Sequence, residues 1–289
     1  MNDLIHSTIL VTGAGGQLGR QVVDLLRQAG ATKVIAGSRD PSKLSIPGVD
    51  VRRIDFADAA SLEIGFAGVD QVLIISTDVV GEVRQKLQLA AVEAAAKAGV
   101  KHIAYTSLSN PGPESPVLIA PDHRVTEEAI KATSVPYTFL RNSIYTDMLL
   151  QALPSVLASG QWFTAAGDGR IAHVTREDCA RAAVAVLLAG PQGVVEVAGP
   201  EPLSMEQIAA IASEVFGTPI TVVKVSTEAL AGGMTSAGLP AEVAALLASF
   251  ETATSLGRHD VQSDVERLTG TPPTGLATFL EANRGTVGH

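Results

Sequence analysis

The sequence predicts an α/β fold, a doubly wound parallel sheet with a smaller helix-rich C-terminal region. Three observations lead to this prediction. Short β-branched runs alternate with helical stretches through the first half of the chain, which is typical of strand–helix–strand units. Four glycines fall within seven residues directly after the first of these runs. Beyond about residue 145 the alternation gives way to longer helical patterns.

The predicted strands of the first half are six short runs rich in valine, isoleucine and threonine. Several of them are apolar nearly throughout, which is typical of strands that helices cover on both faces. A parallel sheet is therefore favoured over an antiparallel one. The runs are residues 7–13, 33–39, 49–56, 69–77, 101–107 and 136–142.

Helices are predicted between these strands. Residues 16–30 carry apolar side chains at helical spacing, and Gly30 supplies a stop signal at the C-terminal end. Residues 83–99 form a second, alanine-rich stretch that also ends in glycine. Together with the strands, these helices predict Rossmann-type architecture. The expected buried stripe of the first helix is Leu18, Val22, Leu25, Leu26 and Ala29.

Later in the chain the predicted elements are more varied. A helical stretch around Pro154 is expected to be interrupted there, because proline cannot donate a helical hydrogen bond. A clear helix over 176–190 precedes a predicted strand over 193–199. Ser204 and Gln207 then form a capping box at the start of a further helix.

The chain is therefore expected to have two parts. Residues 1–145 form the sheet domain, and residues 146–289 form a C-terminal region that returns a helix and a strand to the sheet. In open α/β sheets ligands bind outside the carboxyl ends of the strands. The C-terminal region is expected to close over that edge and to shape a substrate pocket.

Composition excludes several classes of protein. The net charge is −9 with no Lys/Arg-rich run, so a nucleic-acid partner is not expected. No apolar stretch approaches the roughly 20 residues of a membrane span, and no secretory signal is present, so a cytoplasmic location is expected. Cys179 is the only cysteine and is expected to pack as a small apolar residue. No metal site is predicted.

The glycine cluster has the spacing Gly13-x-x-Gly16-x-x-Gly19 between a strand and a helix. The first amides of a helix lack internal partners, and with the helix dipole they favour an anion. A dinucleotide pyrophosphate fits this setting, because glycine lets it approach the backbone. The alternative is a glycine-rich turn without a ligand. The expected contacts are Thr12, Gly13, Ala14, Gly15, Gly16, Gln17, Leu18 and Gly19.

The end of the second strand indicates which dinucleotide binds. Ser38 and Arg39 suit a 2′-phosphate, and Lys43 follows one turn later. Asp40 is the acidic residue that would favour NADH, but Asp40-Pro41 is a helix-start signature and is assigned to capping. NADPH is therefore expected over NADH, and residues 1–145 are predicted to form an NADP-binding domain.

Further cofactor contacts are expected where the next two strands end. Asp55 and Phe56 should lie near the adenine, although Phe56 is equally compatible with core packing. Ser76, Thr77 and Asp78 are expected beneath the nicotinamide side, with a polar strand end facing water as the alternative.

A familiar acid–base pair is missing. Many short-chain dehydrogenases use Tyr-x-x-x-Lys, yet no tyrosine of this chain is followed by lysine at that spacing. Ordinary alcohol dehydrogenation and sugar-nucleotide epimerisation, which require the pair, are therefore disfavoured.

Several motifs occur in an order and spacing that resemble a known family. They are TGAGGQLG (12–19), IAYTS (103–107), His123-x-x-Thr126-Glu127, PYTFLRN (136–142), AAGDG (165–169) and Gly238-Leu239-Pro240. Together they resemble the NmrA-like branch of the atypical short-chain dehydrogenases/reductases, and within it the quinone and triphenylmethane dye reductases. The likeness covers nearly the whole chain, and PYTFLRN and AAGDG are more specific than the glycines.

This resemblance implies an NADPH-dependent oxidoreductase that transfers hydride to a quinone or a similar conjugated small molecule. Carried over by position, Arg39, the loop 13–18, the segment 76–78 and the segment 142–145 hold the cofactor. In the last segment the candidates are Asn142, Ser143 and Tyr145.

Two departures from the family pattern stand out. Ala14-Gly15 replaces the usual Ala-Thr, which leaves phosphate binding intact. Residues 142–145 stand where the quinone reductases have a bulkier aromatic residue, so the shape of the acceptor pocket does not carry over from the family.

An electrophilic acceptor takes hydride without a strong acid beside it. The protein is therefore expected to act mainly by holding the acceptor close to the nicotinamide of the cofactor. His123 is the candidate catalytic helper, with packing or substrate contact as the alternative. Tyr105 and Tyr145 are further catalytic candidates, each also expected as a pocket wall.

Other readings stay open at this point. One is an NADP(H)-binding redox sensor with little turnover, and another is a reductase of triphenylmethane-type dyes or activated carbonyls. A methyltransferase is disfavoured, because Arg39 stands where an acid would be needed. The oligomeric state is left open, with a homodimer among the alternatives.

Overall fold

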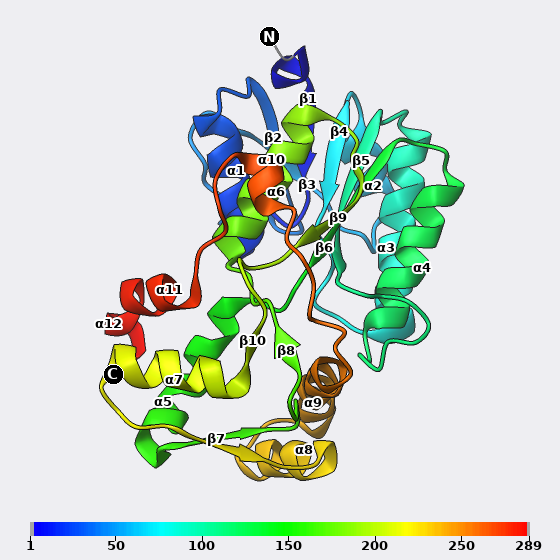
Figure 1. Ribbon diagram of the computed structural model, residues 1–289. Coiled ribbons are helices and arrows are strands. Elements are labelled where there is room, and N and C mark those ends of the chain that lie inside the picture. Colours follow the sequence, from blue (N-terminus) through cyan, green and yellow to red (C-terminus); the bar gives the residue numbers. More distant parts are fainter. Residues whose placement is uncertain (1–2, 288–289) are drawn as a thin grey trace.

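Seven parallel strands form the central sheet of the computed structural model, which describes residues 3–287. They are β1 (Thr8–Val11), β2 (Lys33–Ser38), β3 (Asp50–Arg53), β4 (Gln71–Ile74), β5 (His102–Leu108), β6 (Tyr137–Asn142) and β9 (Gly193–Val197). Their order is β3-β2-β1-β4-β5-β6-β9 (Figure 1), and each neighbouring pair is parallel. The predicted Rossmann-type sheet is confirmed.

Helices cover both faces of this sheet. One face is covered by α1 (Gln17–Gln28) and α6 (Arg176–Ala189), and the other by α2 (Ala59–Phe66), α3 (Gly81–Lys97) and α4 (Ala120–Ala132). Figure 1 shows α1 and α6 to the left of the sheet and α3 and α4 to the right. Successive strand residues therefore enter different cores: Ile9 and Val11 pack beneath α1 and α6, whereas Leu10 packs on the opposite face.

Helix α1 follows its predicted pattern with one exception. Leu18, Val22 and Leu26 are buried as expected, Leu25 is partly buried against the same core, and Gly30 follows the helix end with φ +88°. Ala29 was expected in the buried stripe, but α1 ends at Gln28 and Ala29 is exposed. The apolar spacing in the sequence continues to Ala29, but the helix ends one residue earlier and the chain turns away at Gly30.

The C-terminal region has a core of its own, centred on Leu153, Trp162 and Ile208. Two short sheets, β8–β10 and β7–β11, flank this core. Its elements are α5 (Leu149–Ser159), β7 (Gln161–Thr164), β8 (Arg170–Ile171), β10 (Leu203–Ser204), α7 (Met205–Phe216), β11 (Thr221–Lys224), α8 (Thr227–Ser236), α9 (Ala241–Ser255), α10 (Val265–Thr269), α11 (Leu276–Ala282) and α12 (Arg284–Val287). Figure 1 shows most of them gathered at the end of the sheet opposite the N-terminus.

Two local predictions in this region have different outcomes. The capping box of Ser204 and Gln207 is confirmed, since both of its hydrogen bonds start α7. The interruption at Pro154 is wrong, because α5 continues through it from Leu149 to Ser159. Pro154 lies in the middle of α5 and removes one helical hydrogen bond, but Leu153 and Val156 on either side of it are buried against the C-terminal core, which holds the helix in place.

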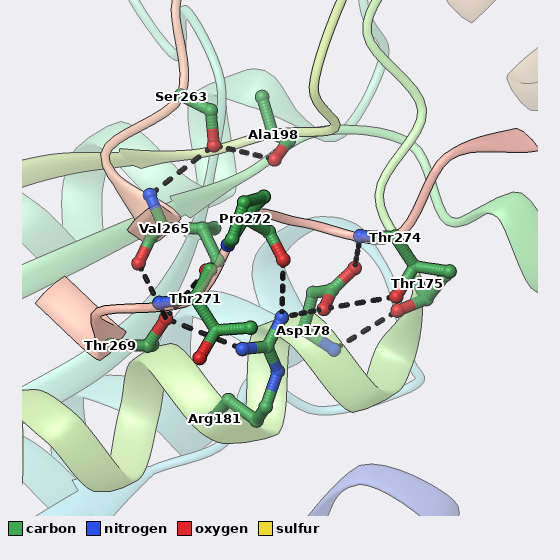
Figure 2. Close-up of polar contacts among 10 residues, drawn as sticks. All are labelled: Thr175, Asp178, Arg181, Ala198, Ser263, Val265, Thr269, Thr271, Pro272 and Thr274. Atoms are coloured by element: carbon green, nitrogen blue, oxygen red, sulfur yellow. Dashed lines mark hydrogen bonds and ion pairs between the residues drawn. The ribbon is translucent and has the colours of Figure 1, made fainter. Parts of the chain in front are cut away.

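After α9 the chain returns to the sheet as a strap, residues 263–274, which α6 fixes (Figure 2). The carboxylate of Asp178 is fully buried, accepts the backbone N–H of Thr274 at 2.8 Å and pairs with Arg181. Arg181 also donates to the carbonyl oxygen of Pro272 at 3.1 Å. This clamp joins the last part of the chain to α6.

Cys179 is buried in the core beneath α6, as predicted for a packed apolar residue. Burial raises the pKa of its thiol well above the ordinary value. A separate feature concerns membranes: between residues 3 and 287, none of the helices combines the length and apolar character that crossing a bilayer requires.

Candidate functional site

The glycine loop between β1 and α1 has the geometry of a turn with an open helix start. Gly13 has φ +63°, a conformation that side chains disfavour, and its carbonyl accepts the N–H of Gly16 at 2.9 Å. Gly16 is the N-cap of α1 and offers no side chain to cap it. Gly13 therefore forms the turn between β1 and α1.

Gly19 is required by packing. A Cβ atom placed there would lie 2.4 Å from the carbonyl oxygen of Gly13 and 2.8 Å from the Cα of Ala14. Both neighbours are backbone atoms and cannot rotate away. The start of α1 therefore packs so closely on the preceding turn that only glycine fits at position 19.

The start of α1 leaves three amides without helical partners. The first recorded helical hydrogen bond runs from Arg20 N–H to the Gly16 carbonyl at 3.0 Å, so Gln17, Leu18 and Gly19 precede it. Gly15, Gly16 and Gln17 are exposed. Uncapped amides at the positive end of a 12-residue helix suit an anionic group, so the loop fits the pyrophosphate of a dinucleotide.

The remaining predicted loop contacts are less accessible. Thr12 is fully buried, and its hydroxyl donates to the Leu73 carbonyl at 3.1 Å and accepts the Ile75 N–H at 2.9 Å. This side chain links β1 to β4, and its single hydroxyl proton is already used. Ala14 and the side chain of Leu18 are also buried, which leaves their backbone for binding.

At the end of β2, Arg39 is the free cation of the predicted set. Its side chain is 75% exposed, and among residues 3–287 it pairs only with the Asp78 carboxylate, 3.9 Å away. Asp40 caps the turn that follows, accepting the Ser42 N–H at 3.2 Å, so its assignment to capping is confirmed. Lys43 pairs with Asp40 at 3.1 Å. The arginine is thus the group most available to a phosphate.

Ser38 lies beside the glycine loop but is already hydrogen-bonded. Its hydroxyl donates to the Asp40 carbonyl at 3.2 Å and accepts the Asp40 N–H at the same distance. A Cβ atom at Gly15 would be 3.6 Å from this hydroxyl oxygen. The ends of β1 and β2 are therefore adjacent, as a shared phosphate site requires.

Asp55 and Phe56, which follow β3 after Ile54, are largely structural. Asp55 pairs with Arg53 at 3.0 Å and accepts the Ala57 N–H at 3.1 Å. Phe56 is partly buried against the core on the α2–α3 face. For Phe56 the geometry favours the packing alternative.

Residues 76–78, which follow β4, have polar groups that are only partly engaged in hydrogen bonds. The Ser76 N–H donates to the Thr106 hydroxyl at 2.9 Å, and Asp78 is 80% exposed beside Arg39. The hydroxyl of Thr77 is buried and has no hydrogen-bond partner among the described residues. The exposed carboxylate of Asp78 places a negative charge near the arginine.

The segment after β6 also contains unpartnered polar atoms. Within the part of the chain that the structure describes, the amide oxygen of Asn142 and the hydroxyl of Ser143 are buried without hydrogen-bond partners. The Asn142 amide donates to the Tyr145 hydroxyl at 3.3 Å. Burial raises the pKa of Tyr145 above the ordinary value, so its hydroxyl stays protonated at neutral pH.

His123 of α4 and Tyr105 of β5 lie together, and Arg84 of α3 contacts the histidine. Arg84 donates to Nε2 of His123 at 2.8 Å. Arginine only donates, so the proton of the imidazole is on Nδ1 and is donated to the Tyr105 oxygen at 2.9 Å. Tyr105 donates in turn to Gln88 at 3.4 Å.

Both residues of this network are buried, His123 with 4% and Tyr105 with 0% exposure. Burial and the charge of Arg84 lower the pKa of His123 well below its ordinary value, and burial raises the pKa of Tyr105. Neither side chain is accessible to an acceptor. The geometry favours packing over catalysis for both.

Sequence reasoning missed a second charged network at the carboxyl ends of β5, β6 and β9. Arg141 forms two hydrogen bonds to Glu127, at 3.0 and 2.8 Å, and Glu127 also accepts from Ser107 at 2.7 Å. Glu196 accepts from Ser109 at 2.9 Å, and burial raises its pKa. The arginine of PYTFLRN and the glutamate of the His123 motif were visible as motif residues, but their pairing was not.

A cavity of about 130 Å³ adjoins the segment that follows β8. His173 contributes to its wall and directly precedes Val174, which bridges to Tyr145. The wall of this cavity is mostly apolar. Elsewhere too, residues 3–287 contain no group of three or more side chains that could hold a metal ion. The lining residues are His173, Pro200, Glu201, Leu203, Ile211, Gly275, Leu276 and Ala277.

Comparison with known proteins gives a consistent result. The model of the NmrA-like family matches residues 5–279. Quinone oxidoreductase 2 of Escherichia coli (strain K12) is 37% identical over 276 residues, covering 93% of this chain and 96% of that protein.

Two solved structures are similar along their full length. The NADPH-dependent quinone oxidoreductase of Escherichia coli in complex with NADPH has a TM-score of 0.90 and 36% identity, with 95% of this chain and 99% of that chain covered. The Citrobacter sp. triphenylmethane reductase complexed with NADP(H) has a TM-score of 0.88 and 36% identity, with the same coverage. Both relatives are reductases, and their structures contain bound NADPH or NADP(H).

Proposed function

Since this chain belongs to the NmrA-like family, we propose that it is an NADPH-dependent oxidoreductase that reduces a quinone or a similar conjugated acceptor. One observation of the structure carries the proposal: the loop before the uncapped start of α1 adjoins the end of β2, where the exposed side chain of Arg39 follows. The helix start suits a pyrophosphate, and the arginine suits the additional phosphate of NADPH. The similarity to a quinone oxidoreductase and a dye reductase supports the choice of acceptor.

When bound, NADPH supplies the hydride. The residues of this chain bind and orient the reactants: the amides of Gln17 and Leu18 and the side chain of Arg39 hold phosphates, and the segment 142–145 lines the site. No acid–base pair of the Tyr-x-x-x-Lys type is present in the sequence, and Tyr105 and His123 are buried away from solvent. Proximity therefore has to supply most of the rate enhancement, and the proton comes from water.

The experiment that tests this proposal is oxidation of NADPH with a panel of quinones, triphenylmethane dyes and activated carbonyls, followed at 340 nm. Turnover with quinones supports the proposal. Turnover with dyes or carbonyls alone would identify the alternative reductase. Binding of NADPH without turnover on any acceptor would instead favour a redox sensor.

Nucleotide selectivity gives a sharper prediction. Arg39→Ala is expected to raise the KM for NADPH about 10- to 100-fold, because a charge-assisted contact to phosphate contributes roughly 1.5–3 kcal/mol. The KM for NADH should change less than about threefold, because NADH lacks the phosphate that the arginine holds.

A matched control is Arg124→Ala, which removes another arginine in a 3.9 Å ion pair, with Glu128 on α4. It should leave both KM values unchanged. An equal rise for NADPH and NADH in the Arg39 variant would refute the assignment of the phosphate.

The proposal includes the setting of the protein. We expect a small-molecule acceptor and a cytoplasmic location, with a homodimer among the assemblies to be tested. The division into a domain of residues 1–145 and a substrate-binding region of residues 146–289 also remains a proposal. Size-exclusion chromatography with light scattering measures the assembly directly.

A further inference from the structure

Arg176 is the first residue of α6 and lies over the aromatic ring of Tyr145. Its guanidinium carbon is 5.1 Å from the ring centroid. The same guanidinium pairs with a carboxylate oxygen of Asp147 at 3.0 Å, and the backbone N–H of Arg176 donates to the other oxygen, also at 3.0 Å. The side chains of Arg176 and Asp147 are each 21% exposed. The arginine is thus fixed by three contacts at a shielded position.

Tyr145 is held from its other sides as well. Its backbone forms a parallel bridge with Val174, and its ring packs against the core beneath α1 and α6. Its hydroxyl accepts the amide N–H of Asn142 at 3.3 Å. A ring bounded by the core on one side and a planar cation on another has little freedom to turn.

The first turn of α6 gives Arg176 a rigid base. Thr175 caps the helix by accepting the Asp178 N–H at 3.0 Å, and Asp178 is in turn bound to the strap at Thr274 (Figure 2). The position of Arg176 is therefore set by residues that lie outside the candidate site.

We infer that Arg176 is a positioning residue: it fixes the ring of Tyr145, and through it the amide of Asn142, in the segment that lines the site. The inference rests on the proposed function for its effect on turnover. The contacts themselves are independent of that function. The residue acts through Tyr145 and does not touch the reactants.

A positioning role predicts a particular split in the kinetic parameters. Arg176→Met keeps the aliphatic length but removes both the stacking cation and the ion pair. We expect kcat to fall about tenfold or more, because small misplacements of a reacting group are costly. The dissociation constant for NADPH should rise less than about threefold, because the amides of α1 and Arg39 are unchanged.

Two further variants make the test specific. Arg176→Lys keeps the charge next to Asp147 but lacks the planar guanidinium, so it should restore only part of kcat. Arg267→Met is the matched control, because Arg267 forms a comparable ion pair with Asp264 at 2.9 Å without stacking on a ring. The control should leave kcat and nucleotide binding unchanged.

A measurement without nucleotide or acceptor separates this inference from the proposed function. The chain has three tyrosines, so ¹³C-tyrosine NMR can resolve the ring of Tyr145. We expect slow ring flipping in the wild type and fast flipping in Arg176→Met, with the folded state retained. Unchanged ring motion would overturn the inference even if quinone turnover is found. Faster ring motion without any turnover in the wild type would overturn only the proposed function.

A double-mutant cycle closes the test. In a Tyr145→Leu background, Arg176→Met should have little additional effect on kcat, because the arginine acts through the ring. Additive effects, or loss of NADPH binding in Arg176→Met alone, would mean that the arginine contacts a reactant directly and would refute the positioning role.

Discussion

Replacing Gly19 by alanine should raise the dissociation constant for NADPH at least about 100-fold, because the new Cβ atom would lie 2.4 Å from the Gly13 carbonyl oxygen. The neighbouring atoms belong to the backbone, so either α1 or the turn must move. Either movement displaces the amides of Gln17 and Leu18 from the place where we propose that phosphate binds. The change should also destabilise the fold by about 1–3 kcal/mol, the usual cost of overpacking.

Calorimetric titration with NADPH and urea unfolding measure the two effects. Gly15→Ala is the matched control, because its Cβ would meet only Leu44 and Ser38 side-chain atoms at 3.6 Å, an ordinary contact. The control should bind NADPH within about threefold of wild type, since an ordinary contact requires no rearrangement. If Gly19→Ala binds equally well, the tight packing of α1 on the turn does not determine nucleotide affinity.

The second large effect concerns stability. Asp178→Ala should lower the free energy of unfolding by about 3–5 kcal/mol, the range seen when one partner of a buried ion pair is removed. The carboxylate of Asp178 is fully buried, and its loss leaves Arg181 without its carboxylate partner and the Thr274 N–H without its acceptor. The strap would then lose its main attachment to α6.

Urea unfolding again gives the number, and limited proteolysis reports whether the strap has become accessible. Glu266→Ala is the control, an exposed carboxylate on the strap itself, and should change stability by less than about 0.5 kcal/mol. A loss below about 1 kcal/mol in Asp178→Ala would show that the strap does not depend on this clamp.

Local signals in the sequence predicted local structure well. The β-branched runs became the strands of the sheet, and the Asp40-Pro41 pair became a capped turn. These outcomes depend on propensity and capping within a few residues, which a sequence displays directly. Gly13 and Gly19 belong to the same class, since the context of strand, turn and helix sets their geometry.

Side-chain environments were harder to predict, because they depend on which helix covers which strand. The sequence places Thr12 in the cofactor loop, yet its hydroxyl forms hydrogen bonds that join β1 to β4. His123 and Tyr105 are candidates for catalysis by residue type, but α3 and α4 bury them. The exposed or buried state of such residues is decided by tertiary packing.

Long-range pairing was beyond the reach of the sequence. Arg181 donates to the Pro272 carbonyl across 91 positions of the chain, and Asp178 binds Thr274 across 96. No pattern within a helix indicates a partner at that separation. The cofactor contacts of Arg39 and of the segment 142–145 remain predictions until nucleotide binding is measured.

The strap also has a consequence for biosynthesis. Strand β9 is the last strand of the sheet, and its outer side is occupied by Asp264, which bonds both the N–H and the carbonyl oxygen of Glu196. An uncovered strand edge invites association with other chains. A nascent polypeptide that has emerged from the ribosome only as far as β9 therefore exposes the edge of this strand. The edge is covered only after the strap has also emerged. Truncation before the strap should for that reason promote aggregation rather than yield a smaller soluble domain.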